Sequence, residues 1–383
     1  MTPYRFSALV AVLATIALSA GCGEEAAPSE DATLRIYVSL PLSGPSSADG
    51  RDAADGARLA LADVGGEVAG YAVEAEFLDD TEGDGADAVW TPARAAANAR
   101  SAIRDSTAIA YVGEFESGAT RASLPITNGA RMLQVSPASS ATDLVAPVPG
   151  SDDVPDVQHS GERTFGRVIP SDDAQARAGA RWAAELGWRR IRVRKDGTPF
   201  GTELANAFEV AVGEEGLDLV RRTFAPFTYL AGGKGLLAAP GNEPINSSGG
   251  PPRMGTDALL SPYAGPLPSA APVYATSAAL DPTQLPAAGQ DFVERFEAEY
   301  GRAPGRYAAY GYEAMAVVLG SIASATDPAD RQAVVEAFFE ISSRDSILGP
   351  YSITETGETT LAMLTGYEVR DGRAEPVAEL EIP

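Results

Sequence analysis

From Thr33 onward, short hydrophobic runs alternate with longer segments in which apolar residues recur every three or four positions. The short runs predict β-strands and the longer segments predict amphipathic helices. Strands that alternate with helices form parallel sheets, because each crossover connection packs its helix onto a face of the sheet. The pattern therefore predicts an α/β fold. In the first part of the chain the expected strands are residues 33–40, 71–80, 107–113 and 131–137.

Apolar positions also predict which faces of the helices are buried. The helix at 52–64 is expected to place one small apolar face on the sheet, as is a helix between the third and fourth strands. The helix at 86–104 is expected to bury Val89, Ala93, Ala96, Ala97 and Ile103. A later helix at 201–215 is expected to bury Leu204, Ala207, Phe208, Ala211 and Val212.

A segment rich in Pro, Asp and Ser at 141–162 interrupts the alternation, which then starts again with a helix at 172–187. Two α/β units in succession predict two lobes with a cleft between them. In open parallel sheets, ligands bind beyond the carboxyl ends of the strands. Residues 231–272 are too rich in Gly and Pro for a long helix. Helices are expected next at 287–300, 305–324 and 329–341, and then short strands within 348–372.

The first residues have the pattern of a secretory leader. Arg5 precedes an apolar run at 8–20 that is too short to span a bilayer. Small residues then precede Cys22, the only cysteine of the chain, so a disulfide framework is excluded. The sequence LSAGC resembles a bacterial lipoprotein box, in which the cysteine is lipidated, although Ser19 replaces the usual aliphatic residue. The alternative is an ordinary leader with an incidental cysteine.

The net charge of −24 makes nucleic acid an improbable partner, because phosphate binding requires clusters of Lys and Arg. The acidity is otherwise explained by solubility. With one histidine, His159 in the Pro-rich loop, a Ser–His–Asp triad and a metal site are disfavoured. No Gly-x-Ser-x-Gly elbow occurs. The acidic run that begins at Asp79 does not fit a Ca²⁺-binding loop, because no glutamate stands at the twelfth position. The sequence GDGADA at 83–88 resembles a dinucleotide-binding glycine motif, but its acids would repel a pyrophosphate.

Five stretches together resemble the type I periplasmic solute-binding proteins, and most closely the branched-chain amino acid group that serves ABC importers. Each stretch is weak by itself, but all five follow the order of the family. The stretches are PLSGPSSADGRDAADGARLALADV, FLDDTEGDGADAV, VGEFESGATRASLP, LQVSPASSATDL, and the pair RYAAYGYEAMAVVLGSI and SILGPYSITETGETT.

The resemblance implies two Rossmann-like α/β lobes joined by a hinge that the chain crosses three times. Residues 1–22 would be the leader and 23–32 a tether. Lobe 1 would comprise 33–168 and 280–347. Lobe 2 would comprise 169–279 and 348–383, and would be reduced, because the family's helices between about 220 and 250 have no counterpart in this sequence.

The resemblance also assigns residues to the ligand site. Ser117 takes the position that binds the ligand carboxylate, at a helix start where free amides and the helix dipole favour an anion. Ala138, Ser139 and Ser140 take positions whose backbone and hydroxyl groups hold the charged ends of the ligand. From the residues alone, the alternative is that these serines cap helices, and both uses can coexist.

Two further residues would come from the second lobe. Asp257 would accept the ligand's ammonium group, and Phe200 would close over the ligand. The alternatives are a solvated loop aspartate and a core phenylalanine.

The expected function is therefore capture of an amino acid or similar small zwitterion, without catalysis, by the solute-binding subunit of an ABC importer. The expected partners are the membrane permease and a lipid anchor at Cys22; we expect a monomer with no cofactor, no metal ion and no nucleic acid. Two alternatives share the fold: a ligand sensor for a membrane receptor, and a binder of an aliphatic amide or urea.

Overall fold

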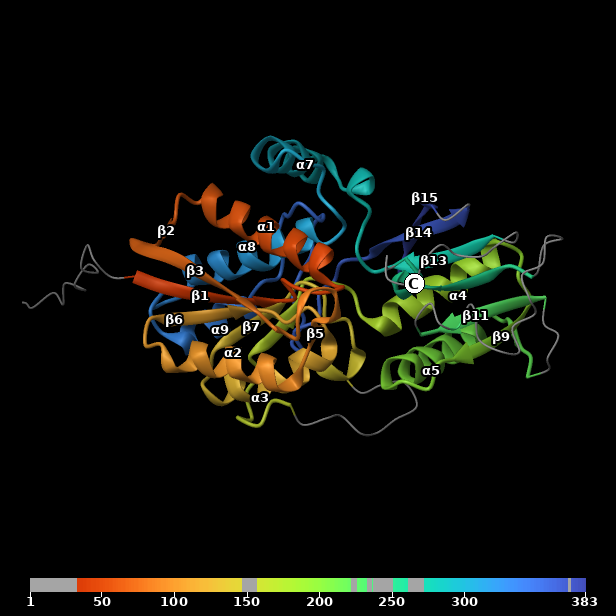
Figure 1. The fold of residues 1–383 in the computed structure, drawn as a ribbon, viewed down its shortest axis with the longest axis horizontal. Helices are drawn as coiled ribbons and strands as arrows, with labels where there is room; N and C mark the ends of the chain where they lie inside the picture. The colour runs from red at the N-terminus through yellow and green to blue at the C-terminus, as the bar shows by residue number, and fades with distance from the viewer. Residues whose placement is uncertain are drawn as a thin grey trace, which may run out of the picture.

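The computed structural model describes residues 33–146, 157–221, 226–232, 236, 251–260, 272–370 and 373–383. Two lobes lie side by side, each built on its own β-sheet (Figure 1). The leader, the tether and Cys22 lie outside the described residues. Within the described part, the chain passes between the lobes after β8, after β13 and before β14, which confirms the predicted two-lobe α/β fold.

The first sheet has six strands in the order β2-β3-β1-β6-β7-β8. Every neighbouring pair is parallel except β2 and β3. The four predicted strands correspond to β1, β3, β6 and β7, whereas the short strands β2 and β8 were not predicted. Its strands are β1 (Thr33–Leu40), β2 (Glu67–Val68), β3 (Tyr71–Asp79), β6 (Ala108–Val112), β7 (Leu133–Ser136) and β8 (Phe165–Arg167).

The second sheet has seven strands in the order β10-β9-β11-β12-β13-β14-β15. The first five are parallel, and β14 and β15 add an antiparallel edge. Its strands are β9 (Arg190–Lys195), β10 (Asp218–Leu219), β11 (Phe227–Ala231), β12 (Arg253–Thr256), β13 (Val273–Ser277), β14 (Met363–Arg370) and β15 (Arg373–Glu381).

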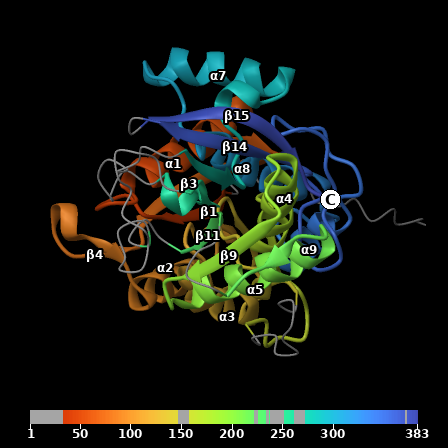
Figure 2. The ribbon, with the colours of Figure 1, turned by 90° about the vertical axis from the view of Figure 1, so that its right-hand side faces the viewer.

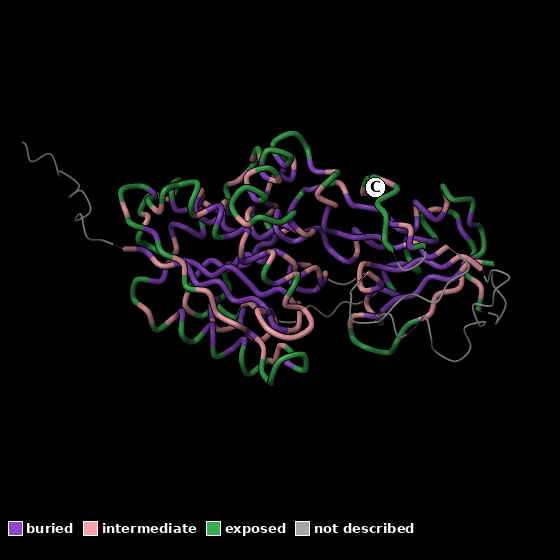
Figure 3. The backbone as a smooth tube through the Cα atoms, turned by 45° about the horizontal axis from the view of Figure 1, so that its top comes forward, coloured by how far each residue is buried: buried purple, intermediate pink, exposed green. Residues whose placement is uncertain are grey.

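Helices cover the sheets and leave the strands buried in the interior of each lobe (Figure 3). In the first lobe α1 packs against α8 and α2 against α3, while α4 and α5 pack together on the second sheet. The expected inward residues of α5 are all buried. The helices are α1 (Ser47–Asp63), α2 (Pro92–Arg104), α3 (Ser117–Gly129), α4 (Asp172–Glu185), α5 (Pro199–Glu214), α7 (Ala287–Tyr300), α8 (Ala308–Ser324) and α9 (Arg331–Phe339).

The expected helix at 86–104 begins six residues late, at Pro92 of α2. The preceding residues form a hairpin of β4 (Thr81–Glu82) and β5 (Val89–Trp90), which projects from the body of the molecule (Figure 2). Thr91 then starts the helix, because its hydroxyl accepts the Arg94 amide at 3.1 Å. The predicted inward face was largely wrong, because an alanine-rich helix gives little contrast between its faces. Its buried residues are Ala95, Ala96, Asn98, Ala99 and Ala102.

Two glycines allow α1 and α8 to approach at backbone distance. A Cβ atom on Gly311 would lie 2.0 Å from the carbonyl oxygen of Ala53, and one on Gly56 would lie 1.9 Å from that of Ala308. No side chain of an L-residue fits at either place, so this contact fixes how the late helix returns to the first lobe.

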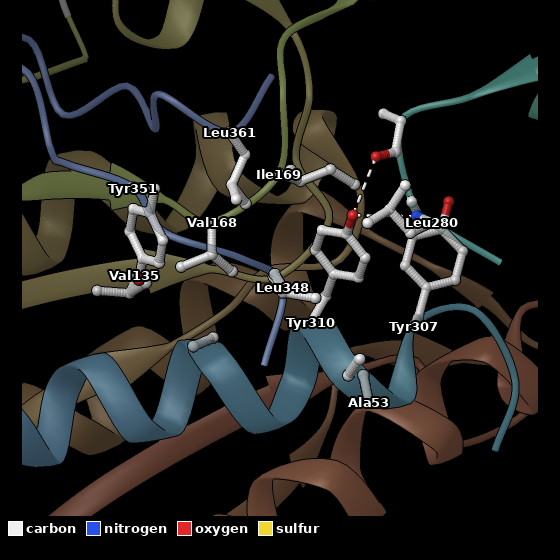
Figure 4. Packing of buried hydrophobic residues seen from close by; sticks show 14 of the residues in the cluster. Ala53, Val135, Val168, Ile169, Leu280, Tyr307, Tyr310, Leu348, Tyr351 and Leu361 are labelled. Carbon is white, nitrogen blue, oxygen red and sulfur yellow. Dashed lines mark hydrogen bonds between the residues drawn. The ribbon is translucent and has the colours of Figure 1, made fainter. Parts of the chain in front are cut away.

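A tyrosine on α8 holds the second passage between the lobes. The Tyr310 hydroxyl accepts the Leu280 amide at 3.0 Å and donates to the Ala278 carbonyl at 3.2 Å (Figure 4). Its ring is buried among apolar residues from several segments, including Leu348 and Leu361. The passage therefore leaves the second sheet from a fixed point on the first lobe.

Replacing Gly311 by alanine should lower the free energy of unfolding by ~1–3 kcal/mol, as overpacking does, because the two backbones must separate. Gly320→Ala is the matched control on the same helix. A Cβ there meets only the end of the flexible Arg344 side chain, at 3.2 Å. Removing a helical glycine should therefore leave stability unchanged or raise it by up to ~1 kcal/mol. Equal stabilities in urea denaturation would show that the close contact is unimportant.

Candidate functional site

A cavity of about 650 Å³ lies between the lobes and is lined by residues from both. Its walls come from the loops that follow β1, β5, β6 and β7 of the first lobe and β9 and β12 of the second, together with the start of α8. Five predicted site residues line this one cavity: Ser117, Ala138, Ser140, Phe200 and Asp257.

The start of α3 presents unused donors to the cavity. The first amides of a helix have no acceptor within the helix. The amides of Ser117 and Gly118 make no hydrogen bond with other residues in the described part of the chain. The Ser117 hydroxyl accepts the Ala141 amide at 3.1 Å and keeps its own proton to donate. It therefore joins the two loops of the first lobe, rather than capping its own helix.

Residue 118 has to be glycine because the indole of Trp90 packs directly against its backbone. A Cβ atom on residue 118 would be 2.4 Å from Cη2 of Trp90. The projecting hairpin thus returns an aromatic ring to the start of α3, where it forms part of the cavity wall.

Ser139 does not line the cavity, unlike its neighbours. Its side chain is fully buried. The hydroxyl shares a 2.7 Å hydrogen bond with the Thr120 hydroxyl and donates to the Glu114 carbonyl at 3.0 Å, and its amide donates to the Ser136 hydroxyl. The hydroxyl and amide of Ser139 therefore fix the loop and lie outside the cavity wall.

Arg167 supports the same loop, a role that the sequence analysis did not identify. Its fully buried guanidinium donates to the carbonyl oxygens of Ser139, at 3.2 Å, and Ala141, at 2.7 Å. It also forms an ion pair with Glu358 from the segment before β14. The shape of the cavity wall therefore depends on an arginine at the first passage between the lobes.

Two polar contacts cross the cavity from lobe to lobe. The Tyr307 hydroxyl donates to Oδ2 of Asp257 at 2.9 Å. Arg121 lies 3.5 Å from Glu203 of α5 and is held by Asp143 at 2.5 and 3.1 Å. Asp257 thus lines the cleft, and one of its carboxylate oxygens already accepts a hydrogen bond.

Aromatic rings form much of the apolar surface of the cavity. Phe115 and Tyr307 meet edge to face, with ring centroids 4.7 Å apart, and Trp90 and Phe200 line other parts of the wall. Phe200 is half-buried at the start of α5, so it faces the cleft and also packs against the core.

Glu116 and Asp49, which the sequence analysis did not identify, also line the cavity. Burial, reinforced by the negative charges of Asp257 and Asp49, raises the pKa of Glu116 to about 7. Burial likewise raises the pKa of Asp172, to about 6, against the opposing effects of Ser140 and Arg167. A glutamate directly before a helix start was not distinctive enough in the sequence to be selected.

A second pair of acids is buried at the end of the sheet. Asp80 and Glu114 are both fully buried. The Tyr111 hydroxyl donates to Glu114 at 2.7 Å, whereas neither carboxylate oxygen of Asp80 has a hydrogen-bond donor in the described structure. Burial, reinforced by the charge of Glu114, raises the pKa of Asp80 to about 9, and burial raises that of Glu114 to about 7.

The histidine that a Ser–His–Asp triad would have to use lies away from the cavity. His159 is exposed and does not line the cavity. Within the described ranges, no cluster of His, Cys, Asp and Glu could hold a metal ion. No helix in those ranges is long and apolar enough to cross a membrane.

The family of periplasmic binding proteins matches residues 33–231 and 250–373, and the chain belongs to this family. Members bind solutes outside the cytoplasm, and those that serve ABC transporters pass small molecules to membrane permeases. No curated protein sequence matches the chain.

Solved structures show the same type I fold. The leucine-binding protein LivK of Thermotoga maritima is 22% identical, with a TM-score of 0.73 over 91% of this chain and 99% of that one. A substrate-binding protein of Desulfitobacterium hafniense, in complex with Leu, is 21% identical, with a TM-score of 0.72 over 90% and 100%. A solute-binding protein of R. palustris, in complex with benzoate, is 17% identical, with a TM-score of 0.68 over 92% and 97%.

The buried acid pair predicts that stability depends on pH. Because the pKa of Asp80 is raised from 3.8 to about 9, the folded protein keeps a proton that the unfolded chain releases above about pH 4. The stability that the folded protein gains from this bound proton is complete below about pH 4. It is lost as the pH rises through about 9. Between pH 5 and 9, the melting temperature should fall less in Asp80→Asn than in the wild type. Asp84→Asn, on the exposed hairpin, is the control and should melt as the wild type does. An unchanged slope in Asp80→Asn would contradict the assignment.

Proposed function

We propose that this chain is the extracytoplasmic solute-binding subunit of an ABC importer, and that it binds an amino acid or similar small zwitterion between its lobes. The observation that carries the proposal is the meeting of Ser117, Ser140 and Asp257 in one cavity, although they come from distant parts of the sequence and from both lobes. The relatives of known structure that contain Leu or Ile support it.

The chemistry of the cavity fits a zwitterion. The free amides and hydroxyl at the start of α3 suit a carboxylate, because donors and the helix dipole converge there. Asp257 and Glu116 suit an ammonium group. The ligand would touch both lobes, and binding to the closed form alone would shift the population of molecules toward closure, which a permease can recognise.

Aromatic carboxylates are the second candidate class of ligand. Trp90, Phe115, Phe200 and Tyr307 line the cavity, and relatives of similar fold are complexed with benzoate and 3,4-dihydroxybenzoic acid. The proposed role in uptake is the same for either class, so one titration panel containing both classes distinguishes them.

Isothermal titration of amino acids, with aromatic carboxylates, aliphatic amides and urea included, tests the proposal. Ser117→Ala should weaken binding of the active ligand by ~1–2 kcal/mol, the value of a charge-assisted hydrogen bond. Ser101→Ala, on the exposed face of α2, is the matched control and should bind as the wild type does. Because Ser117 also accepts the Ala141 amide, melting of each variant should confirm that it is folded. If no compound in the panel binds the wild type, the proposal is wrong.

We also propose that lipidated Cys22 anchors the chain to the outer face of the membrane, with the following polar segment as a tether. The protein expressed with its leader should enter the detergent phase of a Triton X-114 extraction, and Cys22→Ala should move it to the aqueous phase. Partition that is the same with and without the cysteine would exclude lipidation.

A further inference from the structure

The cavity contains two arginines, and they differ in how their guanidinium groups are used. Arg121 is committed to Asp143 and Glu203 by hydrogen bonds and ion pairs. Arg306, just before α8, also lines the cavity, yet it makes no hydrogen bond or ion pair with any residue of the described ranges. Its one described contact is with the ring of Tyr307, whose centroid lies 5.6 Å from Cζ.

The position of Arg306 is set by the backbone that precedes it. A Cβ atom on Gly305 would lie 1.9 Å from a carboxylate oxygen of Asp52, so a larger residue here would have to displace the end of that side chain at the start of α1. Asp52 is itself paired with Arg302. The loop is thus fixed on both sides, and Arg306 is half-buried in the cavity wall instead of extending into solvent.

Arg306 is always charged, and its surroundings favour that charge. Burial opposes the charged form, but Tyr307, Asp257 and Asp49 outweigh burial and raise the pKa of the guanidinium. These carboxylates lie beyond ion-pair distance, so they stabilise the charge without occupying its donors. A guanidinium in the cavity wall whose five N–H donors have no hydrogen-bond partner within the described ranges can bind an acceptor on a ligand.

We propose that Arg306 binds a second anionic group of the ligand, and that the cavity therefore selects amino acids with an acidic side chain. This inference rests on the proposed function, which places the α-carboxylate at the start of α3. A planar guanidinium binds a carboxylate through two parallel hydrogen bonds, which a neutral carboxamide cannot match. Arg306 thus determines specificity for the ligand side chain, whereas Ser117 binds the α-carboxylate that all amino acids share.

The test compares pairs of ligands that differ only in charge: glutamate with glutamine, and aspartate with asparagine, titrated into the full chain. The wild type should bind the acidic member of a pair about tenfold more tightly or better, because a hydrogen bond between charged groups replaces a neutral one. Arg306→Gln should reduce this ratio to near one. Arg306→Lys should give an intermediate ratio, since it keeps the charge but not the paired donors.

Arg100→Gln removes the same charge from the exposed face of α2 and should leave the ratio unchanged. Ser117→Ala should weaken both members of a pair equally. Melting curves should first show that each variant is folded, so that the ratio reports recognition alone.

The inference is overturned if Arg306→Gln keeps the preference for the acid, or if the wild type binds the amides or leucine more tightly than the acids. If the wild type prefers the amides or leucine and Ser117→Ala weakens their binding, the inference fails but the proposed function stands. If no amino acid binds the wild type but an aromatic carboxylate does, the inference fails and the proposed role in uptake stands; if no compound of the panel binds, both fail.

Discussion

All strands of a parallel sheet end at the same edge, and this constraint places most components of the site. In the first sheet, the ends of β1, β3, β6 and β7 lead into loops that carry the serines, the acids and the aromatic rings of the cavity. In the second sheet, β9 and β12 end opposite them, at the loops of Phe200 and Asp257. Residues separate in sequence become neighbours because their strands point the same way.

The same edge concentrates groups that are costly to bury. In the loops that follow β6 and β7, backbone N–H and C=O groups lack the regular hydrogen bonds of a sheet. Buried side chains therefore supply the missing hydrogen-bond partners. Arg167 does so for the carbonyls of Ser139 and Ala141, and Ser136 does so for the Ser139 amide. Arg167 also reaches Glu358, so the loop of the first lobe is tied to the segment that leads back to the second sheet.

The sequence predicted most of the fold because apolar periodicity reports directly on burial. It failed at α2, where alanines on both sides of the helix hide the inward face, and at the hairpin before it, where Val89 is 55% exposed. It also placed Ser139 in the cavity, since spacing cannot show which of three adjacent residues turns inward. Arg167, Glu116 and Arg306 were missed because a single charged residue near a strand or helix end has no distinctive pattern.

The proposed hydroxyl and amide contacts at the start of α3 were predictable from the resemblance, because the loops follow strands in a fixed order. The pairing of Tyr307 with Asp257 was not, because it depends on how closely the two lobes approach each other. Long-range contacts of this kind are a property of the folded arrangement and leave no local signal.

The position of Trp90 gives the chain an optical property. Of the three tryptophans, Trp182 and Trp188 are buried in the core of the second lobe, and the indole of Trp90 lies in the cavity wall. Emission from that one ring depends on whether water or an organic molecule occupies the space beside it. The intrinsic fluorescence of the unlabelled protein therefore contains a signal from the cleft itself, against a background from two rings that solvent scarcely reaches.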